Sequence, residues 1–548
     1  MNKLFTTLDR HRRLLPLLAI LGGALLGLGW HPPLTFLVFI GLVPLLLIEE
    51  YLYKANYKRP FLSLFSLSFL FLVSWNVTSY WWLWNASSWT TLAAWGANAA
   101  LQSLPIMAFH ISKRASKNQL GYLPFVLYWI AFEYVHLHWD LSWPWLNLGN
   151  AFGFTPSWIQ WYEYTGAFGG TLWILIVNIL VFYLIKGRKY WVATGSTLFI
   201  PLLVSLLLWN TYEEKGETIE VLAVQPNVDC YTEKFQYNAR TGGRNQATHI
   251  PYQQQVKTLI ELSKEHMTDS TRFVFWPETA LHNNIFEHKP LKDWAVQEAI
   301  AFNKEYPNSV LVSGVDTYRL YGQEEATETA RFRKSVGYYD VFNAAMFLGE
   351  DNQPTFYHKS QLVIGVETLP WPEVFKPLML NMGGAFGGLG RQQERVAFKN
   401  QEGIGVAPII CYESVYGEYV TDYVQKGANF LSIITNDGWW NNTPGHRQHL
   451  AFASLRAIET RRSIARSANT GISCMINQKG EIITPLAYGL QGAVKGNVSL
   501  NKELTAYVKM GDYIGKLSAL IGVLLFISFL VKKRISFIPT KKKEGVTS

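Results

Sequence analysis

Eight long apolar stretches constrain the fold of this chain more than any other feature. Seven follow one another over about the first 211 residues, and the eighth comes near residue 520. Their approximate limits are 13–30, 34–53, 60–84, 88–112, 121–138, 163–186, 190–210 and 513–531. Each is close to the roughly 20 residues that a helix needs to cross about 30 Å of hydrocarbon. The sequence therefore predicts a helical membrane bundle with eight spans.

Lysine and arginine are distributed unevenly among the loops that join these stretches. They occur before the first span, in the second, fourth and sixth connections, and after the last span: Lys3, Arg10, Arg12, Arg13, Lys54, Lys58, Arg59, Lys113, Arg114, Lys117, Lys186, Arg188, Lys189, Lys532, Lys533, Arg534 and 541–543. The connections near His31, near Asn85 and over 140–162 contain none. Because short basic loops stay in the cytoplasm, we expect both termini inside and the segment between spans seven and eight outside. The net charge of +9 reflects this bias, and nothing else points to nucleic acid.

The region from about 213 to 507 has a different pattern, in which short apolar runs alternate with charged and turn-rich segments. Six runs predict strands: 219–224, 273–275, 310–315, 343–348, 404–410 and 430–435. Amphipathic helices are expected between some of them, as at 252–266 and 449–465. This alternation is typical of an α/β fold. We therefore expect a seven-span membrane domain (1–212), an outward α/β domain (213–507) and an eighth helix with a basic cytoplasmic tail (508–548).

Three apolar runs of the outward domain lead directly into a carboxylate, an ammonium and a thiol. These groups belong to Glu278, Lys359 and Cys411. The ends of strands in α/β folds open onto a crevice, where catalytic groups are commonly placed. Cys411 would attack a carbonyl once Glu278 has taken its proton. Lys359 and the N–H of Tyr412 would then stabilise the oxyanion, and the product would be a thioester on Cys411.

The order and wording of these motifs resemble the nitrilase superfamily, whose members use a Glu–Lys–Cys triad on a four-layer α-β-β-α sandwich. The matching words are FVFWPET, FYHKSQL and APIICYES, with ITNDGWW downstream. A nitrilase-like domain between seven spans and one more is similar to the apolipoprotein N-acyltransferase family, and SWPWLNLG at 142–149 is a further match. That family moves an acyl chain from a phospholipid, through an enzyme thioester, to the α-amine of a lipoprotein's lipid-modified N-terminal cysteine. The resemblance covers nearly the whole chain.

The resemblance implies roles for individual residues. The base, the lysine, the nucleophile and three supporting residues are, in that order, Glu278, Lys359, Cys411, Glu367, Tyr412 and Glu413. The implied partners are a phospholipid acyl donor, a diacylglyceryl-modified apolipoprotein acceptor and membrane lipids. The implied location is the bacterial cytoplasmic (inner) membrane, with the catalytic domain on the periplasmic face. The sequence suggests no cofactor and no metal, and we expect a monomer.

Two regions depart from the family's pattern. The family usually has Pro-Phe-Gly-Glu after the lysine, whereas here Ile-Gly-Val at 364–366 precedes Glu367. The first loop of the domain has Phe235 where a tryptophan is expected, and Trp440 follows Trp439 where the family has phenylalanine. Both changes keep an aromatic wall. We therefore expect Phe235, Trp439 and Trp440 to line the acyl pocket.

Two segments have two interpretations each. The tryptophan-rich loop 139–164 is either a rim that guides lipid to the site or an ordinary belt at the headgroup level. The glycine-rich loop 381–390 is either a lid over the site or a disordered segment without a role. The sequence does not decide between these alternatives.

Other polar residues are interpreted as structural. We expect Glu133, inside the fifth span, to be a neutral, hydrogen-bonded packing residue. His446 and His449 come without the cysteine or carboxylate partners that a zinc site needs. Three arginines are expected on a solvated or salt-bridged helix face: Arg461, Arg462 and Arg466. Only three cysteines occur, at 230, 411 and 474, so the chain is not a disulfide scaffold.

Two other functions compete with acyl transfer. A membrane-tethered amidase would use the same triad on small amides, but it needs an open polar pocket, whereas the three aromatic residues indicate apolar walls. A transporter or sensor would use the outer domain only to bind a ligand. The complete triad argues against that function. The spans argue against it too, because their sequence shows neither paired charges nor broken-helix repeats.

Overall fold

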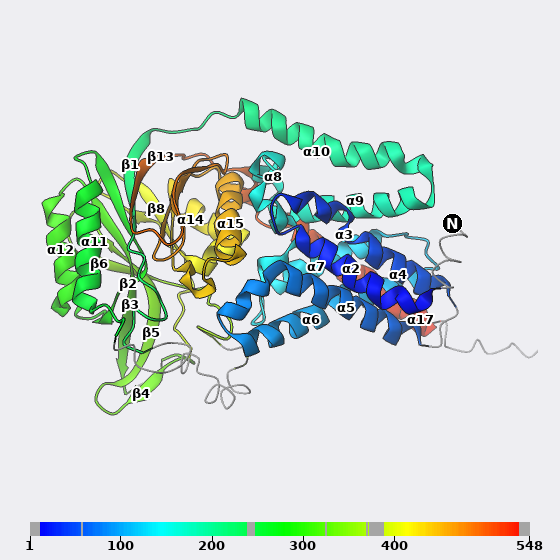
Figure 1. The fold of residues 1–548 in the computed structure, drawn as a ribbon, viewed down its shortest axis with the longest axis horizontal. Helices are drawn as coiled ribbons and strands as arrows, with labels where there is room; N and C mark the ends of the chain where they lie inside the picture. The colour runs from blue at the N-terminus through cyan, green and yellow to red at the C-terminus, as the bar shows by residue number, and fades with distance from the viewer. Residues whose placement is uncertain are drawn as a thin grey trace, which may run out of the picture.

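The computed structural model describes residues 11–55, 59–237, 247–323, 326–368, 371 and 388–535. Helices from the two ends of the chain form a bundle, and the residues between them form two packed sheets with helices outside (Figure 1). The bundle lies at one end of the elongated molecule and the sheets at the other. The predicted fold class, a helical membrane bundle with a nitrilase-like α-β-β-α sandwich, is confirmed.

Apolar runs and helix-starting prolines account for the bundle. Its helices are α2 (Leu15–Leu28), α3 (Val38–Gly41), α4 (Val43–Lys54), α5 (Pro60–Tyr80), α6 (Ser88–Ala115), α7 (Leu123–His136), α9 (Ala167–Lys186), α10 (Trp191–Thr211) and α17 (Tyr513–Ile535). Proline stands in the first turn of α2, α4, α5 and α7, where its missing N–H has no intrahelical partner to lose. Shorter turns are η1 (Arg12–Leu14), η2 (Leu34–Leu37), η3 (Trp81–Asn85) and η7 (Arg188–Tyr190).

Among the described residues, five helical stretches are long and apolar enough to cross a membrane. They are Leu34–Lys54, Pro60–Asn85, Ala167–Lys186, Trp191–Thr211 and Tyr513–Val531. The other three predicted spans contain α2, α6 and α7, which pack with these five. The number of eight spans therefore stays a prediction.

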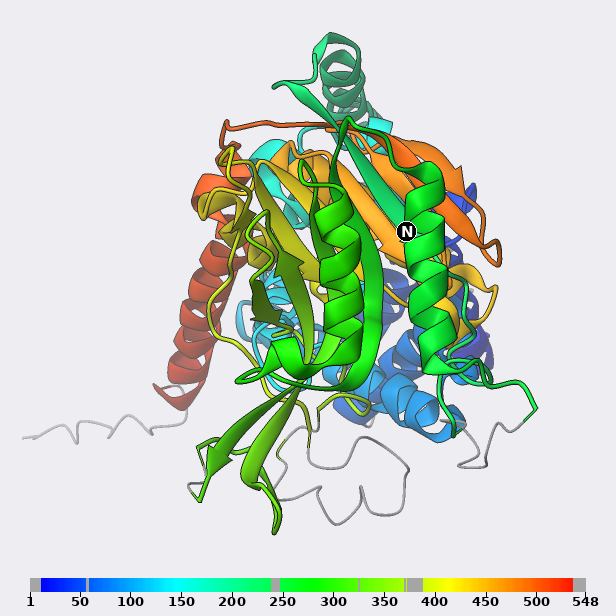
Figure 2. The ribbon, with the colours of Figure 1, turned by 90° about the vertical axis from the view of Figure 1, so that its left-hand side faces the viewer.

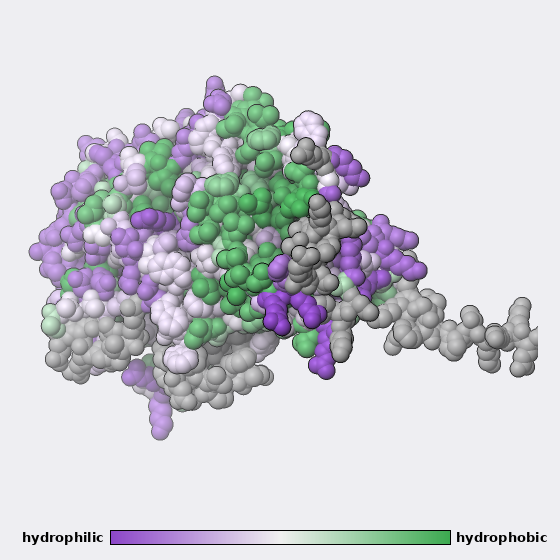
Figure 3. All heavy atoms as spheres, turned by 45° about the vertical axis from the view of Figure 1, so that its right-hand side comes forward, coloured by the Kyte–Doolittle hydropathy of each residue, from purple (hydrophilic) through white to green (hydrophobic). Residues whose placement is uncertain are grey.

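The outside of the bundle is apolar. Figure 3 shows hydrophobic atoms gathered over the bundle, with hydrophilic surface on either side. The helix α10 exposes large apolar side chains, among them Phe199, Leu203 and Leu207 at 58%, 64% and 64%. A helix whose outer face is this apolar is adapted to lipid rather than water. The chain is therefore a membrane protein.

The helix α17 packs against α7, a helix from early in the chain. A Cβ on Gly515 of α17 would come within 2.7 Å of the Tyr134 ring, and one on Gly522 would lie 3.3 Å from the Tyr128 ring. The absence of side chains at these two glycines lets the helices approach closely. The last helix thus completes a bundle that the first helices begin.

Charged side chains are paired inside the bundle, so the expectation of no paired charges in the spans is wrong. Lys113 Nζ of α6 lies 2.7 Å from Glu50 Oε2 of α4, and Lys186 Nζ of α9 lies 3.0 Å from Glu50 Oε1. His110 Nδ1 lies 2.8 Å from Glu49 Oε1. These partners are more than 60 positions apart in the sequence, so no helical spacing reveals them. They join the last turns of α6 and α9 to the C-terminal part of α4.

Glu133 of α7 is fully hydrogen-bonded within the protein. One carboxylate oxygen accepts from Trp129 Nε1 at 3.0 Å and from Leu148 N at 2.9 Å. The other accepts from Thr171 Oγ1 at 2.7 Å. Its predicted role as a hydrogen-bonded packing residue is confirmed.

The tryptophan-rich segment after α7 runs between the bundle and the sandwich. It contains η4 (Pro144–Leu146), η5 (Leu148–Phe154), η6 (Pro156–Trp158) and α8 (Tyr162–Thr165). η5 packs against α9 and also against α15 (Pro444–Thr460) of the sandwich. Trp145 is only 1% exposed, and its ring centroid lies 4.9 Å from that of Trp82 and 5.6 Å from that of Trp440. For Trp145, neither a lipid-guiding rim nor a headgroup belt applies, because the ring is inside the protein.

Gln448 of α15 holds the sandwich against the bundle. Its Oε1 accepts from Trp82 Nε1 at 3.1 Å and from Trp145 Nε1 at 2.8 Å. Its Nε2 donates to the main-chain oxygens of Trp30 at 3.3 Å and Ser79 at 3.0 Å. The residue is 1% exposed, so these four bonds form away from water. The side chain therefore satisfies four groups from three parts of the bundle.

We expect Gln448→Ala to destabilise the contact between the two parts. Each buried polar group left without a partner costs about 1–3 kcal/mol, so the midpoint of thermal unfolding in detergent should fall by roughly 5 °C or more. Gln297→Ala, which removes an exposed glutamine, serves as the control and should leave the midpoint within about 1 °C. Equal midpoints for the two variants would show that Gln448 does not hold the interface.

The sandwich consists of two sheets. The first has the order β13-β1-β2-β3-β5-β4 with β6 beside β5, and the second has the order β12-β11-β10-β9-β8-β7. The strands are β1 (Thr218–Gln225), β2 (Thr271–Phe286), β3 (Val310–Gly322), β4 (Arg331–Arg333), β5 (Gly337–Leu348), β6 (Pro354–His358), β7 (Phe398–Lys399), β8 (Gly405–Ile410), β9 (Phe430–Thr435), β10 (Ile464–Ala468), β11 (Ser473–Ile476), β12 (Ile482–Leu486) and β13 (Gly492–Ser499). The remaining helical elements are α11 (Tyr252–His266), η8 (Pro290–Lys292), α12 (Trp294–Glu305), η9 (Cys411–Val415), α14 (Gly417–Gln425), η10 (Asp437–Trp440) and α16 (Ala506–Met510).

Alternating residues of the strands build the layers. In β2, Phe273 and Phe275 face the second sheet, where their ring centroids lie 5.1 and 6.1 Å from that of Phe430. Val274 and Trp276 pack on the opposite side, beneath α11 and α12, which cover the first sheet (Figure 2). A strand buried on both faces reads as a continuous apolar run. The run in β2 thus fills the core between the sheets and the layer under the helices.

The six predicted strands are confirmed as β1, β2, β3, β5, β8 and β9, and the predicted helix at 252–266 is α11. The helix predicted at 449–465 is wrong at its C-terminal end. α15 ends at Thr460, Arg461 caps it with a left-handed φ of 49°, and β10 begins at Ile464. Neither glycine nor proline marks this boundary in the sequence, so helical periodicity runs through it.

The three arginines near this boundary do not share a helix face, which corrects that expectation. Arg461 is the helix cap, Arg462 lies in the connection, and Arg466 lies on β10. All three are buried rather than solvated. Arg462 Nε donates to the main-chain oxygen of Ala428 at 3.0 Å. Burial of guanidinium groups requires such partners, and two of the arginines form salt bridges as expected, Arg461 with Glu163 and Arg466 with Asp437.

Candidate active site

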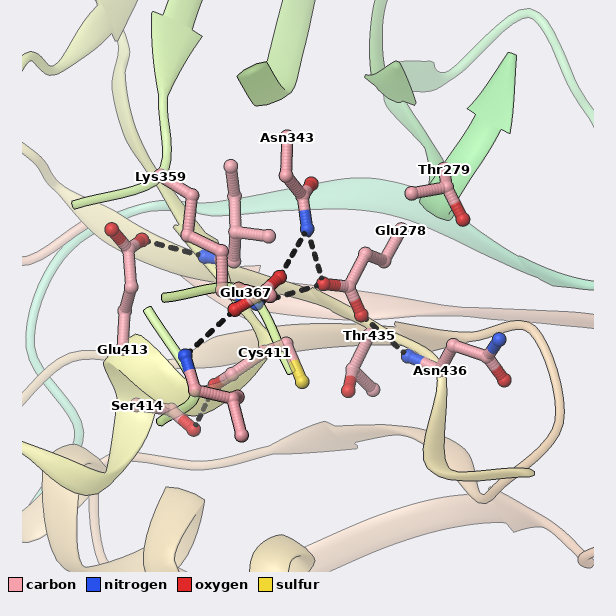
Figure 4. Close-up of polar contacts among 12 residues, drawn as sticks. Glu278, Thr279, Asn343, Lys359, Glu367, Cys411, Glu413, Ser414, Thr435 and Asn436 are labelled. Carbon is pink, nitrogen blue, oxygen red and sulfur yellow. Dashed lines mark hydrogen bonds and ion pairs between the residues drawn. The ribbon is translucent and has the colours of Figure 1, made fainter. Parts of the chain in front are cut away.

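Three elements bring Glu278, Lys359 and Cys411 together (Figure 4). Glu278 lies within β2, just after its buried run, and Lys359 comes directly after β6. Cys411 follows β8 and begins η9. The three residues are 5%, 1% and 8% exposed. A cluster of buried ionisable side chains of different charge is typical of an active site.

The Glu278 carboxylate accepts hydrogen bonds on both oxygens. Oε1 accepts from Lys359 Nζ at 3.0 Å and from Asn343 Nδ2 at 2.8 Å. Oε2 accepts from the main-chain N–H of Asn436 at 3.1 Å. These three donors hold the carboxylate in one orientation. The lone pairs that accept no hydrogen bond therefore point in a fixed direction.

Lys359 lies between two carboxylates. Its Nζ donates to Glu278 and, at 2.8 Å, to Glu367 Oε1. Burial alone would lower the pKa of this lysine, but the negative charges of Glu278 and Glu367 raise it well above its usual value. Lys359 is therefore an ammonium, and it supplies a positive charge that water does not screen.

Glu367 supports this ion pair from the loop after β6. Its Oε1 accepts from Asn343 Nδ2 at 3.1 Å, and its Oε2 accepts from the main-chain N–H of Val363 at 2.8 Å. Gly365, in the Ile-Gly-Val segment, adopts a φ of 80° that favours glycine. The loop that departs from the family's pattern thus still delivers Glu367 to Lys359.

Cys411 has an unusual main-chain conformation. Its φ of 49° lies in the left-handed region, which costs a residue other than glycine of order 1–3 kcal/mol. Burial raises the pKa of the Cys411 thiol, the charge of Glu278 raises it further, and Lys359 lowers it only in part. The resting side chain is therefore a neutral thiol, which needs a base before it can attack a carbonyl.

Glu413, two residues after the nucleophile, fixes the turn from inside. Its Oε1 accepts from the hydroxyls of Tyr357 at 2.8 Å and Tyr419 at 2.6 Å and from Ser360 N at 2.8 Å. Its Oε2 accepts from Ile410 N at 2.9 Å. The residue is fully buried. Glu413 thus joins the residue before Cys411 to the residue after Lys359.

We expect Glu413→Gln to loosen this turn, because the new amide group would face N–H and O–H donors. Leaving such buried donors unpaired should lower the free energy of unfolding by about 2 kcal/mol or more. Thermal unfolding in detergent measures the change, and Glu394→Gln, an exposed carboxylate paired only with Lys426, is the control. An unchanged midpoint for Glu413→Gln would contradict the role assigned to this carboxylate.

The predicted pocket residues lie in two places. The Phe235 ring centroid is 5.2 Å from that of His282, on the side of the Glu278 strand. Tyr231 OH donates to the main-chain oxygen of Trp439 at 2.9 Å. The Trp440 ring centroid lies 4.9 Å from that of Trp82 in the bundle. These aromatic residues stand near the site, and Trp440 joins it to the bundle.

Tyr412, the predicted supporting residue beside the nucleophile, also faces the bundle. It is 4% exposed, and its ring centroid lies 6.3 Å from that of Trp143, in the connection after α7. The nucleophile turn therefore packs directly on the segment that follows α7.

Sequence reasoning missed several polar residues of the site. Asn343 of β5 donates to both Glu278 and Glu367, as described above. Lys234 is 2% exposed, and its Nζ donates to the main-chain oxygen of Glu278 at 3.3 Å and to Thr279 Oγ1 at 2.6 Å. In the sequence, Asn343 is only weakly marked as a site residue, because it interrupts the apolar run of β5. Nothing in the sequence marks Lys234 as a site residue.

Asp316 adds a further carboxyl group. It is paired with Asn343 in the antiparallel register of β3 and β5, so the two side chains stand on the same face of the sheet. Burial raises the pKa of Asp316 to about 7; the charges of Glu278 and Glu367 add to this, and Lys234 opposes it. Asp316 therefore holds its proton more tightly than an aspartate in water.

Two expectations concern metals and a mobile loop. In the part of the chain that the structure describes, no group of three or more histidine, cysteine, aspartate or glutamate side chains could hold a metal ion. Of the glycine-rich segment 381–390, residues 381–387 lie outside the described residues. The two interpretations of that segment, a lid or a disordered segment without a role, both stay predictions.

Comparisons with known proteins agree with this architecture. The family model of the apolipoprotein N-acyltransferase N-terminal domain matches residues 22–180, and that of carbon-nitrogen hydrolases matches residues 246–501. An apolipoprotein N-acyltransferase from Chlorobaculum tepidum is 26% identical over 94% of this chain and 97% of its own length. The chain belongs to the apolipoprotein N-acyltransferase family.

Another apolipoprotein N-acyltransferase, from Thermotoga maritima, is 24% identical over 93% of each chain. Among solved structures, Nit3 of Saccharomyces cerevisiae, a nitrilase-superfamily member, is 14% identical and covers 60% of this chain and 97% of its own, with a TM-score of 0.35. The family assignment rests on the two models and the full-length relatives. The resemblance that the catalytic motifs indicated is thereby confirmed.

Proposed function

We propose that the chain moves a fatty acyl group from a phospholipid, through a thioester on Cys411, to the α-amino group of the lipid-modified N-terminal cysteine of apolipoproteins. N-acylation of lipoproteins is the activity that membership of the family assigns. The observation that supports the mechanism is the buried Glu278–Lys359 pair beside Cys411, at a turn that packs on the membrane bundle. Lipid and lipoprotein substrates both reach such a place from the membrane.

In the first half-reaction, the Glu278 carboxylate takes the proton of the Cys411 thiol. The thiolate attacks the ester carbonyl of the phospholipid, and the oxyanion that forms is stabilised by the Lys359 ammonium and by the N–H of Tyr412. Collapse of this intermediate breaks the ester bond. The leaving alkoxide takes the proton back from Glu278, which yields a lysophospholipid and an acyl thioester on Cys411.

In the second half-reaction, the neutral α-amine of the acceptor attacks the thioester carbonyl. Glu278 takes the proton that the amine loses and passes it to the departing Cys411 thiolate. The products are an amide on the lipoprotein and the free enzyme. Phe235, Trp439 and Trp440 would hold the acyl chain between the two steps, and Glu367 and Glu413 would keep the lysine and the nucleophile in place.

We place the catalytic domain (213–507) on the periplasmic face of the bacterial inner membrane, with spans in 1–212 and 508–548 and both termini in the cytoplasm. Lys54, Lys113 and Lys186 come from three predicted cytoplasmic connections, and all three pair with Glu50. The three lysines therefore lie at the same end of the bundle, opposite the sandwich. An orientation with these connections in the cytoplasm and the sandwich outside requires this. One copy of the chain supplies every group named above, which supports action as a monomer.

The test is to incubate the purified protein with phospholipid alone and to measure its intact mass, with Cys411→Ala as the control. We expect an acyl-sized adduct that hydroxylamine removes and that is absent from the control. Addition of a diacylglyceryl-modified lipopeptide should then release the acyl group as an amide. Hydrolysis of small amides without any adduct would favour a membrane-tethered amidase instead. Neither adduct nor hydrolysis would favour a ligand-binding outer domain.

A further inference from the structure

Besides the Glu278–Lys359–Glu367 group, a row of three buried polar side chains leads to the main chain of Cys411. Arg466 Nη2, on β10, donates to Asp437 Oδ2 at 2.6 Å. Asp437 Oδ1 lies 2.9 Å from His449 Nδ1, and His449 Nε2 lies 3.1 Å from the main-chain oxygen of Cys411. None of the three side chains is more than 1% exposed. The row therefore runs from the second sheet, through η10 and α15, to the residue that carries the thiol.

The partners of His449 Nε2 indicate the direction of its hydrogen bond to Cys411. On the other side of the ring, burial would raise the pKa of Asp437, but the charges of Arg466 and His449 hold it well below its usual value, so Asp437 is a carboxylate; Arg466 Nη2 also lies 3.3 Å from Nδ1. Ser414 Oγ donates its one proton to the main-chain oxygen of Cys411 at 2.7 Å. Its oxygen, 3.0 Å from His449 Nε2, can then only accept. The main-chain oxygen of Cys411 can also only accept, so the hydrogen bond between them runs from His449 Nε2 to Cys411.

This arrangement gives the Cys411 carbonyl two donors, Ser414 Oγ and His449 Nε2. Cys411 is the residue in the left-handed conformation, which needs support from its surroundings. A return to an ordinary conformation would turn its carbonyl away from both donors. It would also turn the side chain, which now lies beside Glu278 and Lys359 (Figure 4).

We propose that His449, held by Asp437 and Arg466, is a positioning residue that keeps Cys411 in the conformation from which its thiol reaches Glu278. His449 does not touch the reacting atoms and exchanges no proton with substrate. The use of phospholipid as the acyl donor in the test rests on the proposed function. The positioning of Cys411 by His449 does not depend on which donor is used.

A purely structural role for the ring has to be separated from this proposal. The His449 ring centroid lies 6.1 Å from that of Trp145 and 5.7 Å from that of Trp440, so any loss of the ring also leaves a void between them. An alanine variant would combine both effects. A more informative substitution keeps most of the volume of the His449 side chain and changes only its hydrogen-bond donors and acceptors.

His449→Gln makes that change. A glutamine amide that donates to the Cys411 oxygen presents its own oxygen to the Asp437 carboxylate, so Asp437 no longer holds the side chain; Arg466 Nη2, which lies 3.3 Å from Nδ1, is then the donor left on that side. When Asp437→Asn is added, the asparagine Nδ2 can donate to the glutamine oxygen at position 449. The asparagine oxygen still accepts from Arg466. The pair His449→Gln and His449→Gln/Asp437→Asn therefore breaks and then restores the same connection to Cys411.

The experiment measures how fast the full-length protein in detergent forms the acyl adduct from phospholipid, together with its thermal midpoint. We expect His449→Gln to slow acylation about tenfold or more, and the double variant to recover most of that loss. The phospholipid concentration that gives half the maximal rate should stay within about twofold. His446→Gln is the matched control, since His446 Nε2 contacts Asn442 Oδ1 at 3.1 Å. It should acylate at the wild-type rate.

Acylation by His449→Gln within about twofold of the wild-type rate would overturn the proposal. A double variant no faster than the single one would also overturn it. Alkylation of Cys411 by iodoacetamide, followed by peptide mass, provides a readout that needs no lipid, and it should slow and recover in the same order. If the wild-type protein forms no acyl adduct, the proposed function fails. The alkylation series then decides on His449: slowing with recovery supports the proposal, and equal rates overturn it.

Discussion

Replacement of Cys411 by serine should abolish acyl transfer, by about 10⁴-fold or more, while the chain stays folded. The hydroxyl has nearly the volume of the thiol, but it gives up its proton far less readily. Glu278 is matched to a thiol whose pKa is already raised by burial, and it cannot activate an alcohol to the same extent. A serine ester would also be a poorer acyl donor than a thioester in the second half-reaction.

Intact mass after incubation with phospholipid measures the first half-reaction, and transfer to a lipopeptide measures the second. Cys474→Ser, a buried cysteine in β11 outside the site, is the matched control and should keep its acylation rate. An adduct that forms on the Cys411→Ser variant at more than a hundredth of the wild-type rate, and that peptide mass places outside position 411, would mean that another group is the nucleophile.

The second large effect is expected for Lys359→Met, which should lose both activity and stability. Without the ammonium, Glu278 and Glu367 would be two buried carboxylates without the cation that pairs with both, and breaking such a pair costs about 3–5 kcal/mol. The oxyanion would lose its charged partner as well, so we expect acylation to fall by about 10³-fold or more. Thermal unfolding in detergent and intact mass measure the two losses separately.

The double variant Lys359→Met/Glu367→Gln separates the two roles of the lysine. Removal of one carboxylate should restore most of the unfolding midpoint, and acylation should stay lost because no cation faces the oxyanion. Lys426→Met, which breaks an exposed pair with Glu394, is the control and should change neither quantity. If the double variant regained acylation, the oxyanion would not depend on Lys359.

The main features of the site could be predicted from the sequence because they follow strand ends. Glu278, Lys359 and Cys411 each come directly after or within an apolar run. Strand pairing places Glu278 and Lys359 in the first sheet, and packing of the second sheet on the first brings Cys411 to them. The fold class followed from the same runs and from the length of the apolar stretches. These signals are local, so a single sequence carries them.

The parts that the sequence did not predict depend on pairing between distant segments. Arg466 lies on a strand because β10 joins β9 and β11, whereas its own neighbourhood has helical periodicity. His449 shows no signal as a partner of Cys411, since Asp437 reaches it from another element. The pairing of Glu50 with Lys113 is likewise invisible to short-range patterns. In each case a tertiary contact decides the role of the residue.

The close packing of α17 on α7 affects how the chain is made. When α7 leaves the ribosome, the face of α7 that carries Tyr128 and Tyr134 still lacks α17, because Gly515 and Gly522 are synthesised nearly 400 positions later. In the proposed topology, the whole sandwich crosses the bilayer during that interval. Bundle closure then comes last, after export of the catalytic domain. A chain that stopped before residue 513 would carry the complete triad above a bundle still open to lipid along α7.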